Sequence, residues 1–321
     1  MNTKLKKILK ITLPLALGVF LIWYSIYSAT PDERQILWTA ITNAEIEWVV
    51  LSVFLGMLSH ISRAYRWQFL LDTIGSRTTF YNRFFAVMIG YLANMGVPRS
   101  GEILRGATLT TYEKVPFEKS FGTIVSERLV DFVMLLLITG IAFIWQFDLL
   151  YTYFDEKNIN PFTSITVLVA LLLIGILILK LLKKANHNLL IKIKSFAEGL
   201  LDGIKSALLM KKKWSFLFHT LAIWILYILM IYVSKYAVSG TENLSFQAIL
   251  ATFVAGSFAM TVTNGGIGLY PIAIGAILLL FDIQQATGEA LGWIIWGSQT
   301  LLILFLGSLS FILLPVLNKA K

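Results

Sequence analysis

The sequence predicts an all-α membrane protein: a polytopic helical bundle of about six spanning helices plus two re-entrant broken-helix hairpins arranged as an inverted repeat. Three observations predict this fold class. Hydrophobic residues make up 57% of the 321 residues and charged residues only 14%, whereas soluble domains contain roughly 25% charged residues. Apolar runs of about 20 residues recur along the chain, long enough to cross a hydrocarbon core of about 30 Å. Two further apolar segments are interrupted by Asn, Gly and Pro.

The uninterrupted apolar runs define the predicted spanning helices of a single transmembrane domain, residues 1–321. The first run follows "MNTKLKKILK". It is too long for a signal peptide and lacks a small-residue cleavage site, so we expect it to be retained. No soluble catalytic domain of ordinary size fits between the runs. The predicted spans are residues 9–28, 48–71, 117–147, 162–182, 214–236 and 287–315.

Positive charges collect in the first ten residues, in residues 180–213 and at the C-terminal end. Acidic residues occupy the other connections. The positive-inside rule therefore predicts a multi-pass protein of the inner (plasma) membrane with both termini in the cytoplasm. The connector 183–213 alternates Lys with apolar residues, so it is either a surface helix on anionic lipid or a solvated amphipathic connector. Membrane topology accounts for the net charge of +9, and no nucleic-acid partner is expected.

The two interrupted segments, residues 80–112 and 245–281, do not fit the spanning pattern. Each has two short apolar halves around a break, "NMGVP" in the first and "NGGIG" in the second. Halves of this length are too short to span the membrane comfortably. Non-helical backbone at membrane depth must be buried in protein or line a wet cavity. We therefore predict re-entrant hairpins entering from opposite faces, with a substrate site where the breaks meet. Alternatively the likeness is accidental, because these residue types are common in loops.

Charged side chains concentrate in the first half of the chain, at helical spacing. Ionisable groups at helix centres cost at least about 2.5–3.5 kcal/mol each on insertion scales, so they normally pair or face a cavity. The five arginines exceed the three carboxylates by two charges, and the guanidinium fork matches phosphate. Glu102 is the expected partner of Arg105. The charged residues are Arg63, Arg66, Arg99, Glu102, Arg105, Glu127, Arg128 and Asp131.

These residues and the two breaks form the predicted site for an anionic group. The "RSGE" stretch also starts a short helix, whose free N–H groups favour an anion. Two non-functional alternatives remain. Arg63 and Arg66 could extend (snorkel) to the lipid headgroups, or the other charges could form a purely structural ion-pair network. The break residues included in the site are Asn94, Asn264, Gly265 and Gly266.

Other functional signatures are absent from the sequence. No G-x-x-x-x-G-K-[ST] motif for ATP is present. The three histidines are scattered and there are no cysteines, so we expect neither a metal site nor a disulfide. No catalytic residue or cofactor is predicted.

The stretches "NMGVPRSGEILRG", "ERLVDF" and "TNGGIG" resemble the flippase-like transmembrane domain of lysylphosphatidylglycerol synthases. The resemblance covers nearly the whole chain, although Asn264 stands where the family usually has Pro. It implies movement of a phospholipid or another anionic lipid-linked headgroup between leaflets. The cytosolic domain that uses aminoacyl-tRNA in full-length synthases has no counterpart here, so synthesis of lysyl-lipid is not expected.

The sequence thus favours a lipid flippase or scramblase-like transporter that is not an enzyme. Its expected partners are anionic membrane lipids, with a homo-oligomer or an envelope-synthesis partner possible. Two rival hypotheses stay open. One is an intramembrane lipid-modifying enzyme that uses Glu127 or Asp131 as a base, and the other is a non-transporting accessory subunit of envelope synthesis.

Overall fold

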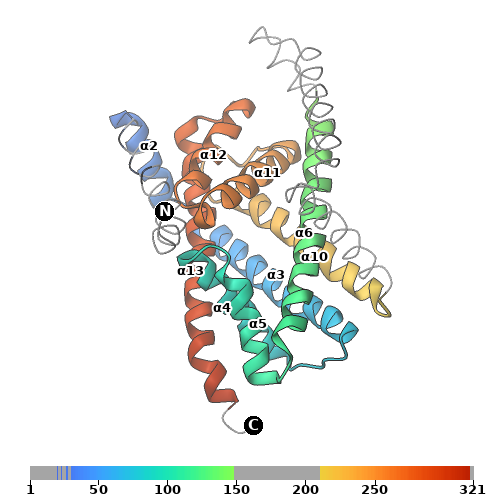
Figure 1. Cartoon of the computed structure of the whole chain (residues 1–321). Helices are drawn as coiled ribbons and strands as arrows, with labels where there is room; N and C mark the ends of the chain where they lie inside the picture. The colour runs from blue at the N-terminus through green and yellow to red at the C-terminus, as the bar shows by residue number, and fades with distance from the viewer. Residues whose placement is uncertain (1–19, 21–22, 24–26, 28–29, 148–209, 319–321) are drawn as a thin grey trace, which may run out of the picture.

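The computed structural model describes residues 30–147 and 210–318, together with Phe20, Trp23 and Tyr27. All regular secondary structure in the described part of the chain is helical (Figure 1). Within it, four helices are long and apolar enough to cross a membrane. These four are α3 (Ile46–Thr73), α6 (Phe117–Trp145), α10 (Lys213–Ser234) and α13 (Gln285–Leu317).

These helices confirm four of the predicted spans to within two residues at each end. The remaining spans, 9–28 and 162–182, and the connector 183–213 up to residue 209 lie outside the described residues, apart from Phe20, Trp23 and Tyr27. Hydropathy locates such helices well because a spanning segment must satisfy its backbone internally and present apolar side chains outward.

Both interrupted segments are pairs of short helices with a break between them. The first pair is α4 (Phe80–Gly96) and α5 (Ser100–Glu113). The second is α11 (Phe246–Val262) and α12 (Leu269–Leu278), joined through the 3-10 turn η1 (Asn264–Gly266) and followed by η2 (Leu279–Phe281). Gly265, Gly266 and Gly268 adopt positive φ angles in the second break, a conformation that glycine adopts without steric cost.

Helices α3 and α10 pack along one another in antiparallel directions. The start of α3 meets the end of α10, where the Glu45 N–H donates to the Ala237 carbonyl at 3.0 Å. At the opposite end, Lys212 Nζ donates to Asp72 Oδ2 at 3.0 Å. Helix α13 packs against α3, α4 and α12, so it contacts both broken pairs (Figure 1).

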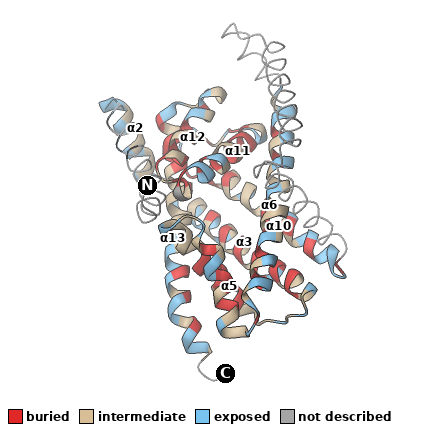
Figure 2. Ribbon diagram, in the orientation of Figure 1, coloured by how far each residue is buried: buried red, intermediate tan, exposed pale blue. Residues whose placement is uncertain are grey.

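The outer faces of α6 and α13 are exposed and apolar, whereas buried residues face the bundle interior (Figure 2). Leu136 on α6 and Phe305 on α13 are 54% and 66% exposed. Exposed apolar side chains of this size on the outer faces of both helices suit contact with lipid.

Helix α2 (Pro31–Thr42) was not expected from the sequence. Its start is fixed by a capping box, in which the Thr30 hydroxyl accepts from the Glu33 N–H and Glu33 accepts from the Thr30 N–H. The "TPDE" stretch is the signature of such a start, with Pro at the first helical position. The helix is short and polar, so hydropathy alone does not detect it.

Candidate functional site

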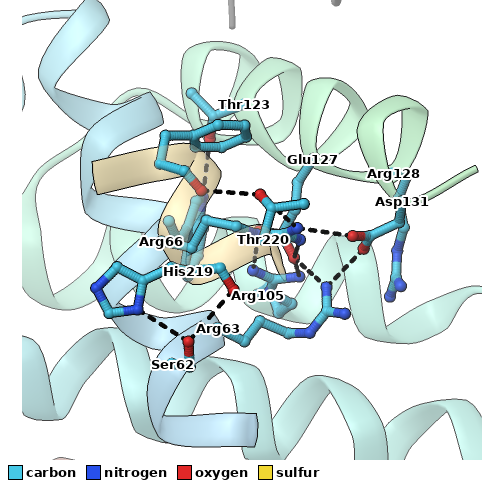
Figure 3. Close-up of polar contacts among 12 residues, drawn as sticks. Ser62, Arg63, Arg66, Arg105, Thr123, Glu127, Arg128, Asp131, His219 and Thr220 are labelled. Atoms are coloured by element: carbon cyan, nitrogen blue, oxygen red, sulfur yellow. Dashed lines mark hydrogen bonds and ion pairs between the residues drawn. The ribbon is translucent and has the colours of Figure 1, made fainter. Parts of the chain in front are cut away.

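The carboxylate of Glu127 lies at the centre of the site, fully buried in α6 and beside three guanidinium groups (Figure 3). Arg63 Nη1 and Arg66 Nη2, one turn apart on α3, lie 2.5 Å and 3.3 Å from Glu127 Oε1. From α5, Arg105 Nη2 donates to Glu127 Oε2 at 3.1 Å. Glu127 therefore ties the first broken pair to two spanning helices.

Asp131, one turn further along α6, adds a second carboxylate. Its Oδ2 accepts from Arg63 Nη1 and its Oδ1 from Arg66 Nη1, both at 2.7 Å. Helix α10 contributes neutral partners: Arg63 Nη2 donates to the Tyr227 hydroxyl at 3.3 Å, and Arg66 Nη1 to Thr220 Oγ1 at 3.4 Å. The cluster thus joins α3, α5, α6 and α10.

Arg105 is held in place by close packing as well as by charge. Its guanidinium carbon lies 4.3 Å from the centroid of the Trp67 ring, a cation–π contact. The Trp67 indole N–H donates to Thr123 Oγ1 at 2.9 Å, which fixes the ring. The stem of Arg105 crosses Gly90, where an added Cβ would lie 2.7 Å from the Arg105 Cγ. A larger residue at position 90 would push the arginine away from Glu127.

The buried cluster carries one positive charge in excess, because three arginines face two carboxylates. The Arg63, Arg66 and Arg105 side chains are only 4%, 0% and 3% exposed. Their Nε atoms are buried and have no hydrogen-bond partner among the described residues. Breaking a buried pair costs about 3–5 kcal/mol, since the remaining charge is left uncompensated. The cluster is therefore rigidly paired, yet it keeps positive charge and donors to spare.

Glu102 pairs with Arg128, and the sequence-based expectation that it pairs with Arg105 is wrong. Arg128 Nε and Nη2 donate to Glu102 Oε1 at 3.1 Å and 2.8 Å. Arg105 turns toward Glu127 because Gly90 leaves room for its methylene groups and the Trp67 ring packs against its guanidinium group. Helical spacing alone could not distinguish these partners, since it fixes the face of a helix and not the direction of a long side chain.

The first break is held by Asn94, whose Oδ1 accepts from the Gly101 N–H at 2.7 Å. Its Nδ2 lies 3.5 Å from Glu102 Oε2. Arg99 caps α5 in the left-handed conformation, with φ 64°. It is exposed, and it makes no ion pair or hydrogen bond within the described residues. An arginine without a carboxylate at the tip of the pair adds further positive charge there.

The second break lies against α4 but is not joined to the charged residues. The Trp296 indole N–H donates to the Gly265 carbonyl at 2.7 Å. A Cβ on Gly266 would lie 2.8 Å from the Met260 sulfur. No hydrogen bond or ion pair of the described side chains connects these two glycines to the arginine cluster. The two breaks approach one another where η1 packs against α4.

Sequence reasoning missed three side chains that complete the site: Trp67, Thr220 and Tyr227. The last two lie in the second half of the chain, in a helix of high mean hydropathy. A tyrosine and a threonine spaced seven residues apart share one helix face, and this is the one signal that could have found them. Among the described residues, no three His, Asp or Glu side chains are placed to hold a metal ion.

Together, these helices and this cluster define a multi-pass helical membrane protein with a buried arginine–carboxylate site at a broken helix. The family model for the lysylphosphatidylglycerol synthase TM region matches residues 11–307, and the chain belongs to this family. The match confirms the resemblance noted in the sequence, and it is consistent with a role connected to membrane lipids.

Among curated proteins, the chain is similar to the UPF0104 membrane protein MJ1595 of Methanocaldococcus jannaschii. The two are 31% identical over 100 residues, which is 30% of this chain and 30% of the length of that relative. No solved structure matches the chain.

Proposed function

We propose that this protein moves an anionic phospholipid, or another anionic lipid-linked headgroup, between membrane leaflets without altering it chemically. The observation that carries the proposal is the buried cluster around Glu127. It holds one more guanidinium than carboxylate, and three of its buried Nε donors have no partner in the described part of the chain. Guanidinium groups bind phosphate through paired charge-assisted hydrogen bonds. The excess charge and the spare donors suit a passing phosphate.

We infer that the chain contains an inverted repeat, and this arrangement supports the transport proposal. Helices α3 to α6 would form one half and α10 to α13 the other, each a spanning helix, a broken pair and a second spanning helix. The helix contacts in one half match those in the other. Helix α3 packs on α4 as α10 packs on α11, and α5 packs on α6 as α12 packs on α13. Likewise α4 packs on α13 as α11 packs on α6. Helices α3 and α10, which the repeat would make equivalent, run antiparallel, as two halves of opposite orientation would require.

In this proposal both broken pairs are re-entrant, and their tips lie between the leaflets. Inverted repeats allow alternating access because one half can rock against the other around a fixed site. The phosphate would cross through the bundle while the acyl tails stay in lipid. Helix α5 would carry the moving part of the site, because Arg105 reaches Glu127 from the first broken pair.

The proposed setting is the inner (plasma) membrane, with both termini in the cytoplasm. Lys212, beside Asp72, then lies at the cytoplasmic end of α10. The excess of Lys and Arg in residues 180–213 supports this orientation.

The test is a transport assay with the purified protein in liposomes. Fluorescent lipids that differ only in headgroup are placed in one leaflet, and their appearance in the other is followed. We expect phosphatidylglycerol to move faster than in protein-free liposomes, and faster than a diacylglycerol analogue without phosphate. Equal acceleration of both lipids would contradict a phosphate-recognising site.

A further inference from the structure

We propose that Arg128 is the residue that first binds the phosphate of an anionic phospholipid, and that this phosphate displaces Glu102. The inference rests on the proposed function for its ligand class. It divides the charged residues into an exchangeable outer pair, Glu102 and Arg128, and a permanent inner cluster of Arg63, Arg66 and Arg105 with Glu127 and Asp131.

Exposure separates the outer pair from the inner cluster. The Arg128 side chain is 39% exposed and that of Glu102 is 21% exposed. The inner arginines are at most 4% exposed, and Glu127 is completely buried. A carboxylate released from a half-exposed pair can be hydrated again, whereas a buried one cannot. The outer pair can therefore open at much smaller cost.

The geometry of the outer pair also leaves it incomplete. Both contacting nitrogens of Arg128 donate to the same oxygen, Glu102 Oε1. The other oxygen of Glu102 lies at the long distance of 3.5 Å from Asn94 Nδ2. An arginine and a carboxylate bind best when two parallel hydrogen bonds use two oxygens. A phosphate can offer Arg128 two oxygens at once, so it competes well for this arginine.

The surroundings of Arg128 indicate a lipid as the source of that phosphate. Val125, Arg128, Phe132 and Leu136 recur at helical spacing on one face of α6. The three apolar side chains are 42%, 43% and 54% exposed. On α5, Ile103 follows Glu102 directly and is 53% exposed. A phosphate on Arg128 would thus lie beside apolar surface that acyl chains can cover, which free phosphate cannot use.

Replacement of Glu102 by a phosphate at Arg128 would also change how firmly the first broken helix is held. Glu102 lies in the first turn of α5, and Asn94 of α4 holds that turn through the Gly101 N–H. When a phosphate displaces Glu102, α5 loses its ion pair with α6 at this end. The ion pair between Arg105 and Glu127 remains between the two helices, one turn deeper. Binding at the surface is thereby linked to the freedom of the hairpin tip.

Binding to the purified full chain in detergent tests the inference independently of transport. The probes are dioctanoyl phosphatidylglycerol, dioctanoylglycerol (which lacks phosphate) and inorganic phosphate. For the phospholipid, we expect Arg128→Ala to raise Kd about tenfold, the loss of one charge-assisted pair. The Kd of Arg128→Lys should lie between those of the wild type and Arg128→Ala, because lysine keeps the charge and loses the guanidinium fork. Glu102→Gln should lower Kd severalfold, because the competing carboxylate is gone.

Lys119→Ala is the matched control: it removes one positive charge from an exposed position on the same helix and should leave Kd unchanged. If Arg128→Ala does not fold, Glu102→Gln and Arg128→Lys still decide the question. An unchanged Kd in Arg128→Lys and Glu102→Gln overturns the inference. Equal binding of inorganic phosphate and phospholipid overturns the lipid assignment. If the wild type transports lipid but these variants bind it with unchanged Kd, the inference alone is refuted. If the variants change Kd as expected but the wild type does not transport lipid, the proposed function alone is refuted.

Discussion

Arg105 and Glu127 form a buried ion pair, 3.1 Å between Nη2 and Oε2, that connects the second helix of a broken pair to a spanning helix. The pair stands beside Arg63 and Arg66, which bind the same carboxylate. This shared carboxylate makes Glu127 the residue on which the folded arrangement of α3, α5 and α6 depends.

Glu127→Gln should therefore destabilise the protein more than Asp131→Asn. Loss of Glu127 leaves three guanidiniums against one carboxylate in a buried place, at a cost of about 3–5 kcal/mol. Asp131 pairs with two arginines of the described residues, against three for Glu127, and its side chain is 12% exposed, so water can replace part of its role. Thermal unfolding of both variants in the same detergent measures the order, and an equal loss would show that Glu127 is not the centre of the cluster.

A double-mutant cycle should distinguish the partner of Arg105. Arg105→Ala and Glu127→Gln remove groups in contact, so their effects should be coupled by about 0.5–3 kcal/mol. Arg105→Ala and Glu102→Gln should add to within about 0.5 kcal/mol, because Glu102 binds Arg128. Unfolding free energies of the single and double variants provide both numbers. Strong coupling only in the second cycle would restore the pairing expected from helical spacing.

Gly101→Ala should prevent α4 and α5 from packing together. A Cβ at this position would lie 2.0 Å from the Gly90 carbonyl oxygen, so the two helices must separate. Overpacking of this kind costs typically 1–3 kcal/mol, and here the obstacle is backbone. Gly122→Ala on α6 is the control, because nothing lies within 4 Å of its added Cβ. It should be neutral or stabilising by up to about 1 kcal/mol. Similar melting temperatures for both variants would contradict the close crossing.

The two ends of α10 should be accessible from opposite sides of the membrane. The chain has no native cysteine, so single cysteines can be placed at the exposed positions Lys211 and Ser239. A membrane-impermeant thiol reagent added to intact cells should label Ser239→Cys and spare Lys211→Cys, and disruption of the membrane should expose both. Labelling of both positions in intact cells would refute the spanning role of α10.

The sequence predicted the four long apolar helices that the structure describes, and both breaks, because hydropathy and glycine placement act locally. It also identified all the charged members of the cluster, since charges in apolar helices are conspicuous. It could not assign their partners. Whether Glu102 meets Arg105 or Arg128 depends on the direction of the Arg105 side chain, which passes Gly90 and Trp67 to reach Glu127. Trp67 and Tyr227 were missed for a similar reason, because aromatic residues are unremarkable in a membrane helix until an arginine is seen beside them.

The most direct test of the central claim compares lipid movement by the wild type and Arg105→Ala in liposomes. Each purified protein is first shown to be folded by its melting temperature. Movement of leaflet-labelled phosphatidylglycerol is then followed at equal protein content. We expect the wild type to accelerate movement clearly, Arg105→Ala to retain a small part of that rate, and Arg105→Lys to fall between them, because lysine keeps the charge without the fork. Full transport by a folded Arg105→Ala protein, or no acceleration by the wild type, would contradict the account.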